Sequence, residues 1–436
     1  MTENSKRVVF VSQRFTPEKG GNASRIHDTV THLGQQGWEP IVLSPPPCYP
    51  PGEFDQSWKR TTTDTVDGIT VHRLWSWQPQ VENPGMLHRL PYYLLFGIHA
   101  MIWLVWNVRQ YDMVVTSTPP ISTGAPGLLA AVVGKPWVVD VRDLWIDASV
   151  SLGYIAEGGL VERISREFQR HVLQAADRIT VTTDGIGESI QETYGESLGE
   201  KIVIIPNGVD IDRFRPEKPN STAPTADNTT QLETQRATTA VTTTREPQSP
   251  PVVIYTGNLG TAQDLESCIR ALTHLSNDET IFRIVGSGDC ESELTTLATE
   301  QGVADRVEFT GLVERDAVPK LLNDADIGLA PLKSSTELAY AMPTKLYEYL
   351  ACGLPVVTTG CGEIERFIAD SGGGVHASNS PERIAERIDE LLDNPKKRQH
   401  AAEQGRAYVE RFDRGLIASR LGDELTQVYN THEATS

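Results

Sequence analysis

Two successive runs of strand-like and helix-like segments restrict the folds open to this chain. The first run begins with an apolar strand at residues 7–12, a loop, a helix from about 23 to 36 and a second strand at 40–44. The second run begins with an apolar strand at 252–257. Alternating strands and helices build a parallel sheet covered by helices. We therefore expect an α/β protein of two Rossmann-like domains facing across a cleft, with ligands at the carboxyl ends of strands.

A polar segment separates the two runs. Residues 217–251 are rich in Thr, Ser, Pro, Asn and Gln and carry almost no large apolar side chain. Such a segment buries too little apolar surface to fold, so we expect a disordered linker or loop. This places an N-terminal domain at 1–216, a C-terminal domain at 252–412 and a final helix at 413–436 that could pack back on the N-terminal domain.

The formal net charge of −19 and the sequence pI of about 5.0 argue against a nucleic-acid-binding protein, which would usually carry a basic face. An acidic surface also fits a salt-loving protein, because carboxylates stay hydrated at high ionic strength. An ordinary acidic cytosolic protein is the alternative. The five cysteines form no CxxC pair, and no signal-peptide pattern opens the chain. These features indicate a cytoplasmic protein with reduced thiols.

Residues 90–106 are almost continuously apolar and predict a helix. The stretch is slightly short for a membrane span of roughly 20 residues. Strand-like segments at 69–74 and 113–117 would belong to one sheet, which argues against a crossing between them. Its two tryptophans favour a helix that partly contacts a membrane surface. A wholly buried helix is the alternative. We expect a cytoplasmic protein, peripheral at the inner face of the cell membrane.

Residues 343–357 predict a short helix, a stop at Gly353 and a buried strand. The unpaired N–H groups of a helix N-terminus favour an anion, so Thr344 and Lys345 lie where a phosphate would bind. Glu348 lies one turn further along, out of register for a capping box. It is therefore free to accept hydrogen bonds from a ribose diol. The alternative is a surface helix with a solvated glutamate.

A glycine-containing loop follows the first strand of each domain. Backbone N–H groups in such loops can cradle a phosphate or a sugar hydroxyl. An ordinary turn is the alternative for either loop alone, but two such loops facing each other are less easily explained by chance. The predicted nucleotide-sugar contacts are Gly20, Gly21, Asn22 and Arg25 in the first domain and Gly257, Asn258, Leu259 and Gly260 in the second.

Charged residues also follow the predicted strand at 137–141, where Asp140, Arg142, Asp143 and Trp145 would reach the cleft. We predict Asp143 and Arg142 as catalytic residues. Asp143 could orient a sugar hydroxyl or act as a general base, and Arg142 could bind phosphate. The alternative is a structural Asp–Arg pair at a strand end. The sequence predicts no metal site. Asp210 and Asp212 match the DxD pattern that binds metal in another fold, but here they follow a loop at the end of the first domain.

Seven segments together resemble the family 4 glycosyltransferases of the GT-B fold, in particular fucosamine-transferase-like enzymes of surface-polysaccharide and lipid-linked oligosaccharide assembly. The resemblance implies a retaining EC 2.4 enzyme with a UDP- or GDP-type nucleotide-sugar donor held mainly by the C-terminal domain. It also implies a lipid-linked or glycan acceptor held by the N-terminal domain, and no required metal or other cofactor. The segments are 20–25, 117–120, 140–145, 205–210, 257–260, 309–311 and 343–357.

Two features depart from this family. It often shows two glutamates eight positions apart; Glu348 matches the second, but Tyr340 stands at the first, and Glu337 is out of register. The phosphate-binding Arg and Lys of many relatives are absent from 258–264. Two other functions therefore remain open. One is a nucleotide-sugar 2-epimerase on the same fold, and the other is a catalytically silent nucleotide-sugar-binding subunit.

Overall fold

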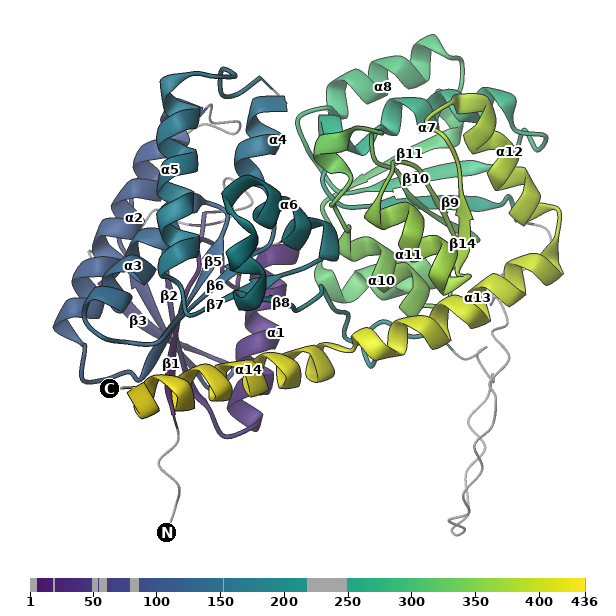
Figure 1. The fold of residues 1–436 in the computed structure, drawn as a ribbon. Coiled ribbons are helices and arrows are strands. Elements are labelled where there is room, and N and C mark those ends of the chain that lie inside the picture. Colours follow the sequence, from purple (N-terminus) through teal and green to yellow (C-terminus); the bar gives the residue numbers. More distant parts are fainter. Residues whose placement is uncertain are drawn as a thin grey trace, which may run out of the picture. The chain divides into compact units, whose positions relative to one another are not determined.

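The computed structural model of the chain describes residues 6–18, 20–48, 54, 61–78, 86–151, 153–217 and 249–435. They form two compact units, each with its own sheet (Figure 1). The N-terminal unit runs to Gly208 and also contains Tyr340–Met342 and the segment from Phe412 onward. The C-terminal unit contains Val209–Ala339 and Pro343–Arg411. Residues 218–248 of the expected linker lie outside the described residues.

An eight-stranded sheet forms the centre of the N-terminal unit, in the order β3-β4-β2-β1-β5-β6-β7-β8. All neighbouring strands are parallel except β3 and β4, which form an antiparallel pair at one edge. The central strands are apolar along their whole length because both faces of the sheet are covered. The strands are β1 (Arg7–Val11), β2 (Glu39–Ser44), β3 (Thr61–Val66), β4 (Ile69–Leu74), β5 (Met113–Thr118), β6 (Trp137–Val141), β7 (Arg178–Val181) and β8 (Ile202–Ile204).

Helices cover this sheet in two layers. On one face, Ile26, Val30 and Leu33 repeat at helical spacing along α1 (Gly21–Gln35) and pack with α14 (Arg414–Thr435) against the sheet. On the other face, a second core cluster joins the sheet to four further helices. These are α2 (Met86–Trp106), α3 (Gly124–Val132), α5 (Leu160–Ala175) and α6 (Asp184–Tyr194); the short α4 (Trp145–Ser151) precedes α5.

A six-stranded parallel sheet forms the centre of the C-terminal unit, in the order β11-β10-β9-β12-β13-β14. Its strands are β9 (Val252–Thr256), β10 (Ile281–Val285), β11 (Val307–Gly311), β12 (Ile327–Ala330), β13 (Val356–Thr358) and β14 (Gly374–His376). One face packs on α7 (Leu265–Ala271), α8 (Glu291–Glu300) and α12 (Pro381–Leu392). The remaining helices are α9 (Val318–Asn323), α10 (Thr344–Ala351), α11 (Glu363–Ser371) and α13 (Pro395–Val409).

Two segments late in the sequence complete the N-terminal unit. The hydroxyl of Thr183 donates to the carbonyl of Tyr340 at 3.0 Å, which holds the Tyr340–Met342 segment. On α14, Arg414 forms an ion pair with Asp28 of α1 and donates from Nε to the carbonyl of Gly208 at 3.1 Å. The final helix is therefore part of the N-terminal unit rather than a separate element.

The first unit also ends earlier than the expected boundary at residue 216, since Val209 already belongs to the C-terminal unit. The reason lies in the residues that follow. Phe214 is fully buried there, and Arg406 of α13 donates to its carbonyl at 2.9 Å. Burial of this aromatic ring stabilises the packing of the segment on the C-terminal unit.

The main strands and the two-domain α/β class are confirmed, while β3 and β14 were not predicted. The helix after β1 begins at Gly21, two residues earlier than expected. The predicted helix within 343–357 is α10, and Pro343 stands at its N-cap position. Gly353 has the predicted stop conformation, with φ of +70°. Its N–H bonds to Leu350, and the next N–H bonds to Tyr349, which closes the helix as a Schellman motif.

The apolar stretch at 90–106 lies within α2. Tyr92, Phe96, Ala100 and Leu104 repeat every four residues and are buried against the sheet. His99 is satisfied, with Nδ1 2.7 Å from the carbonyl oxygen of Trp75. Among the helices of the described residues, none has the length and hydropathy needed to span a bilayer.

Loss of the buried ion pair between Arg25 and Asp140 should destabilise the N-terminal unit. The pair is 2.7 Å long and its side chains are 8% and 9% exposed. Asp140→Ala leaves a buried guanidinium without its partner, which should lower the free energy of unfolding by about 3–5 kcal/mol. All eight tryptophans precede residue 209, so tryptophan fluorescence during urea unfolding reports on this unit alone.

The matched control is Glu167→Ala, which removes the partner of Arg170 from an exposed ion pair on α5. This variant should change the free energy of unfolding by less than about 1 kcal/mol. Equal effects of the two substitutions would show that the buried pair does not anchor the unit.

Candidate functional site

The loop after β9 forms the centre of the candidate site in the C-terminal unit. Gly257 has a φ of +131°, and its N–H bonds to the carbonyl of Val285 at 2.9 Å. A Cβ on Gly286 would lie 1.9 Å from the carbonyl oxygen of Gly257, and one on Gly288 would lie 2.5 Å from that of Leu259. The loops after β9 and β10 therefore touch through their backbones, which only glycines permit.

The N-terminus of α10 meets the same loop. The ammonium of Lys345 lies 3.6 Å from the centroid of the Tyr255 ring and donates to Oε1 of Gln263 at 3.3 Å. It would lie 3.2 Å from a Cβ on Gly257. The hydroxyl of Tyr349 accepts the N–H of Thr256 at 2.7 Å, which fixes α10 against the end of β9. The structure thus brings the glycine loop and the predicted phosphate-binding helix together.

Burial lowers the pKa of Lys345 from its usual value to about 7. The negative charge of Glu348 opposes this lowering of the pKa. A lysine with such a pKa is half charged near neutral pH and would gain a full charge beside an anion. The site therefore offers a cation, a cation–π platform and free helix N–H groups in one place.

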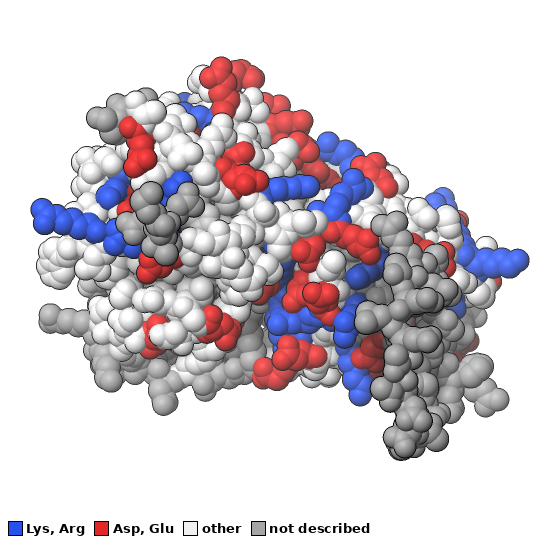
Figure 2. All heavy atoms as spheres, turned by 90° about the horizontal axis from the view of Figure 1, so that it is seen from below, with Lys and Arg blue, Asp and Glu red and all other residues white. Residues whose placement is uncertain are grey.

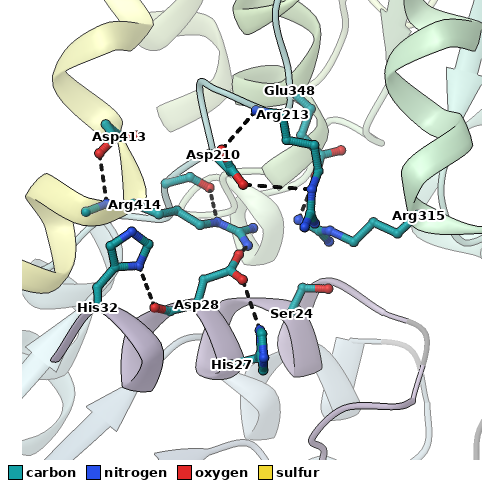
Figure 3. A network of polar contacts seen from close by, with 12 residues as sticks. Ser24, His27, Asp28, His32, Asp210, Arg213, Arg315, Glu348, Asp413 and Arg414 are labelled. Atoms are coloured by element: carbon teal, nitrogen blue, oxygen red, sulfur yellow. Dashed lines mark hydrogen bonds and ion pairs between the residues drawn. The ribbon is translucent and has the colours of Figure 1, made fainter. Parts of the chain in front are cut away.

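Glu348 lies one turn along α10, and its side chain is 14% exposed. Arg315, just before α9, approaches it with Nη2 3.8 Å from Oε1 (Figure 3). Burial raises the pKa of Glu348, and the charge of Arg315 opposes that shift. Nε and Nη2 of Arg315 have no hydrogen-bond acceptor among the residues that the structure describes. Sequence reasoning missed Arg315, since no motif marks it.

The first aspartate of the DxD match, in the same unit, forms hydrogen bonds with nearby backbone N–H groups. Oδ1 of Asp210 accepts the N–H groups of Asp212 at 3.1 Å and Arg213 at 3.0 Å, which closes a turn. The other oxygen lies 3.8 Å from Nε of Arg213 (Figure 3). Across the described parts of both units, no three His, Cys, Asp or Glu side chains gather as a metal site would require.

The N-terminal unit changes the roles expected of Arg25 and Asp140. Arg25 does not present a free guanidinium to a phosphate, because it is bound to Asp140 and is 7% exposed. Asp140 also accepts hydrogen bonds from Ser117 at 3.1 Å and Thr180 at 3.0 Å. Burial opposes ionisation of Asp140, but Arg25 and these donors hold its pKa below the usual value. This is a structural Asp–Arg pair, with Arg25 in place of Arg142.

Arg142 and Asp143 remain near the N-terminus of α1. Arg142 donates from Nη1 to Oδ1 of Asn22, next to Gly20 and Gly21, while its Nε makes no hydrogen bond with any described residue. Burial and the charge of Arg25 lower the pKa of Arg142 to about 9. Asp143 keeps an exposed surface, yet the surrounding protein raises its pKa. The structure thus brings Gly20, Gly21, Asn22 and Arg142 together, and Asp143 follows Arg142 in the chain.

The surface charge is mixed on the face that Figure 2 shows, where acidic and basic side chains are interspersed. The strongly negative total charge therefore does not gather on that face as a single patch. The salt-loving character of the chain stays a prediction.

Two family models match the sequence. The model described as "Glycosyl transferase 4-like domain" covers residues 20–208, and the one described as "Glycosyl transferases group 1" covers residues 239–408. Together they span both units. The chain belongs to the family 4 glycosyltransferases. This confirms the resemblance and makes the protein a glycosyltransferase of class EC 2.4.

Individual relatives agree with this assignment. WcaI of Escherichia coli (strain K12), provisionally named a colanic acid biosynthesis glycosyl transferase, is 26% identical over 359 residues, covering 81% of this chain and 83% of WcaI. A D-inositol 3-phosphate glycosyltransferase of Xylanimonas cellulosilytica is 27% identical over 315 residues, covering 70% of each chain.

Solved structures show the same GT-B fold. Sucrose-phosphate synthase from Thermosynechococcus elongatus gives a TM-score of 0.75 at 16% identity, covering 98% of this chain and 100% of that one. WaaG, a glycosyltransferase of lipopolysaccharide biosynthesis, gives 0.66 at 18% identity, covering 96% and 99%. Anabaena HepE in complex with UDP-glucose gives 0.67 at 16% identity, covering 97% and 99%.

Binding of a nucleoside diphosphate to this glycosyltransferase should depend on the protonation of Lys345. Its charged form, which favours the diphosphate, predominates below about pH 7 in the free protein. Raising the pH from 7 to 8.5 removes that proton, so calorimetry with UDP or GDP should show binding weakened about tenfold. Lys345→Arg stays charged throughout and should show little change. A flat profile for the wild type, or an equally steep one for Lys345→Arg, would contradict this assignment.

Proposed function

We propose that this glycosyltransferase transfers a sugar from a UDP- or GDP-type donor to a lipid-linked or polysaccharide acceptor, with retention at the anomeric carbon. The observation that carries the proposal is the meeting of Lys345 with the Gly257–Gly260 loop at the carboxyl edge of the second sheet. Ligands of open parallel sheets bind at that edge. The UDP-glucose complex of Anabaena HepE, on the same fold, is consistent with such a donor.

In this proposal the C-terminal unit holds the donor. The N–H groups of Asn258 and Gly260 in the loop after β9, and those of the first turn of α10 with Thr344, bind the diphosphate. Lys345 adds a positive charge, and Glu348 accepts hydrogen bonds from the ribose hydroxyls. Arg315 keeps Glu348 ionised and has donors left for the nucleotide. The backbone groups of Asn258 and Leu259 fix the shape of the loop.

 The carbonyl of Asn258 accepts the Tyr255 hydroxyl at 2.5 Å, and the N–H of Leu259 bonds to the carbonyl of Ser287 at 3.0 Å, so the loop is held in place.

The main catalytic task is to stabilise the departing nucleoside diphosphate as the glycosidic bond forms. Donors fixed in advance stabilise developing charge without reorganisation, which is where much of the rate enhancement of enzymes arises. The positive end of α10 and the ammonium of Lys345 perform this task in the proposed site. We propose that they replace a divalent metal ion.

The N-terminal unit would hold the acceptor. Asp143 keeps an exposed surface, and Arg142 is fixed by Asn22 next to the Gly20–Gly21 turn. We propose that Asp143 orients or deprotonates the acceptor hydroxyl and that Arg142 contacts donor or acceptor. Arg25 has no place in this set because Asp140 occupies its guanidinium.

Two rival functions give different products. A nucleotide-sugar 2-epimerase would not need an acceptor, and a silent subunit would bind nucleotide without turnover. Release of UDP or GDP that depends on added acceptor would exclude both. Retention is tested separately, by the anomeric configuration of the product in NMR spectra.

Glu348→Gln should weaken binding of UDP or GDP about 10- to 100-fold, because a charged acceptor contributes about 1.5–3 kcal/mol to a hydrogen bond. The 2′,3′-dideoxy nucleotide lacks the diol and should bind the wild type and Glu348→Gln with nearly equal affinity. Calorimetry with both nucleotides and both proteins measures the coupling free energy between Glu348 and the ribose diol directly.

Glu365→Gln, which changes an exposed residue on α11 of the same unit, is the control and should bind both nucleotides like the wild type. If Glu348→Gln lost the same affinity for the dideoxy nucleotide as for the normal one, Glu348 would not contact the ribose.

We also propose that the transferase works at a membrane surface, which α2 contacts. Opposite its buried side, this helix exposes an apolar stripe at four-residue spacing, and Trp106 at its end is 82% exposed. Exposed apolar residues on α3 and α5 belong to the same helix layer, and Arg109 and Arg163 are exposed cations near them. An apolar surface with nearby cations suits a bilayer with anionic lipids. The stripe is Leu90, Leu94, Ile98, Ile102 and Val105, and the other positions are Val132, Leu160, Val161 and Ile164.

The full chain should float with vesicles of phosphatidylglycerol and phosphatidylethanolamine in a density gradient. Replacing Ile98 and Ile102 together by Ser removes exposed methyl groups without touching the buried side, and should reduce the floated fraction severalfold. Leu416→Ser, which changes a 52% exposed position on α14, is the control. Recovery of the wild type only at the bottom of the gradient would refute the membrane contact.

A further inference from the structure

A long ion pair joins Arg315 and Glu348 in the C-terminal unit (Figure 3). Nη2 of Arg315 lies 3.8 Å from Oε1 of Glu348, which is too far for a direct hydrogen bond. The two side chains are 29% and 14% exposed, so the pair is mostly enclosed but reaches the surface. Nε and Nη2 of Arg315 make no hydrogen bond with any residue that the structure describes. Buried donors in folded proteins usually have an acceptor, so these two point to a ligand.

The surrounding residues fix the guanidinium of Arg315. Its centre lies 5.8 Å from the centroid of the Phe214 ring, which is within cation–π distance, and Phe214 is 1% exposed. Arg315 also begins a short 3-10 turn, Arg315–Ala317, in which the N–H of Ala317 bonds to the carbonyl of Glu314 at 2.9 Å. Both the backbone and the side chain of Arg315 therefore have a defined place beside Glu348.

Three positive charges act on Glu348. Burial is the largest influence on this carboxyl and raises its pKa, whereas Arg315, Lys345 and Arg213 lower it. These cations favour the ionised carboxylate, which can only accept hydrogen bonds. The guanidinium of Arg315 can only donate them. The pair therefore offers an acceptor and a donor side by side.

This arrangement restricts the chemistry of a ligand group that contacts both side chains. An oxygen about 2.8 Å from Nη2 and from Oε1 can meet both atoms at once, because they are 3.8 Å apart. A carbonyl oxygen would only accept, and a phosphate oxygen would be repelled by the carboxylate of Glu348. A hydroxyl both accepts and donates. The group that fits Arg315 and Glu348 together is therefore a hydroxyl.

We propose that Arg315 and Glu348 bind the same hydroxyl of the nucleotide ribose, and that Arg315 thereby selects ribonucleotides over deoxyribonucleotides. The hydroxyl oxygen accepts a hydrogen bond from the guanidinium, and the hydroxyl donates its own proton to the carboxylate. The inference rests on the proposed function, in which Glu348 binds the ribose. It makes Arg315 a second contact of the ribose, rather than a residue that only keeps Glu348 charged.

Calorimetry of the full chain with UDP, 2′-deoxy-UDP and 3′-deoxy-UDP, or with the corresponding GDP series, tests the proposal. These nucleotides carry no transferred sugar, so the only sugar hydroxyls are those of the ribose. Arg315→Met has neither the charge nor the donors, and should bind the ribonucleotide about tenfold more weakly. It should bind the deoxy nucleotide that lacks the contacted hydroxyl nearly as the wild type does. An equal loss for all three nucleotides would leave Arg315 a structural role and overturn the proposal.

The Glu348→Gln background separates direct contact from an effect of charge, since no carboxylate remains there to be kept ionised. Adding Arg315→Met to Glu348→Gln should still weaken binding of the ribonucleotide severalfold. The affinity for the deoxy nucleotide should not change further. If the added substitution changed neither affinity, Arg315 would act only through the charge of Glu348, which would overturn the proposal.

The matched control is Arg283→Met. Arg283 on β10 is also paired with a glutamate of the same unit, Glu308 at 2.8 Å, and its side chain is 22% exposed. This variant should bind every nucleotide like the wild type. If Arg315→Met bound no nucleotide, Arg315→Lys would be measured instead, because it keeps the charge beside Phe214 but loses the forked donors. Its loss of affinity should again depend on the ribose hydroxyl, and a loss equal for all three nucleotides would overturn the proposal.

The same measurements separate this inference from the proposed function. A chain that binds neither UDP nor GDP, or a Glu348→Gln variant that loses the same affinity for every nucleotide, would overturn both. A loss in Glu348→Gln that depends on the ribose hydroxyl, together with a loss in Arg315→Met that does not, would overturn only the role of Arg315.

Discussion

Contact between two backbones determines the shape of the candidate donor site. The loops after β9 and β10 approach so closely that a single Cβ on Gly286 would overlap the carbonyl of Gly257. Because these loops leave no room for side chains between them, Lys345 can reach the loop after β9 over the Tyr255 ring. The Schellman turn at Gly353 ends α10 after two turns and returns the chain directly to the sheet.

A different constraint acts in the N-terminal unit. Asp140 sits at the end of a buried strand, where an unpaired carboxylate would be costly. Arg25 from α1 neutralises it and in doing so ties α1 to β6. This ion pair occupies Arg25 and Asp140, two charged residues that a sequence pattern would assign to ligand binding. The neighbouring Arg142 and Asp143 remain for chemistry, since neither is enclosed to the same degree.

The fold was predictable from sequence because its strands are short apolar runs and its helices lie between them. The helix at α10 was predictable in detail, since proline and glycine restrict the backbone at its two ends. Side-chain partners were not. The sequence spacing of Asp140 and Arg142 suggested a local pair, whereas the true partner, Arg25, lies 115 positions away. Arg315 and the place of Tyr340 likewise depend on tertiary contacts that no short motif encodes.

The central claim is that a nucleoside diphosphate binds to the loop after β9 and the first turn of α10. Hydrogen–deuterium exchange of the full chain, with and without saturating UDP or GDP, tests it most directly. We expect slower exchange in the segments 257–260 and 344–348 when nucleotide is bound, because the N–H groups of Asn258, Gly260, Thr344 and Lys345 would donate to the diphosphate. Nucleotide bound by calorimetry, but with unchanged exchange in both segments, would contradict the claim.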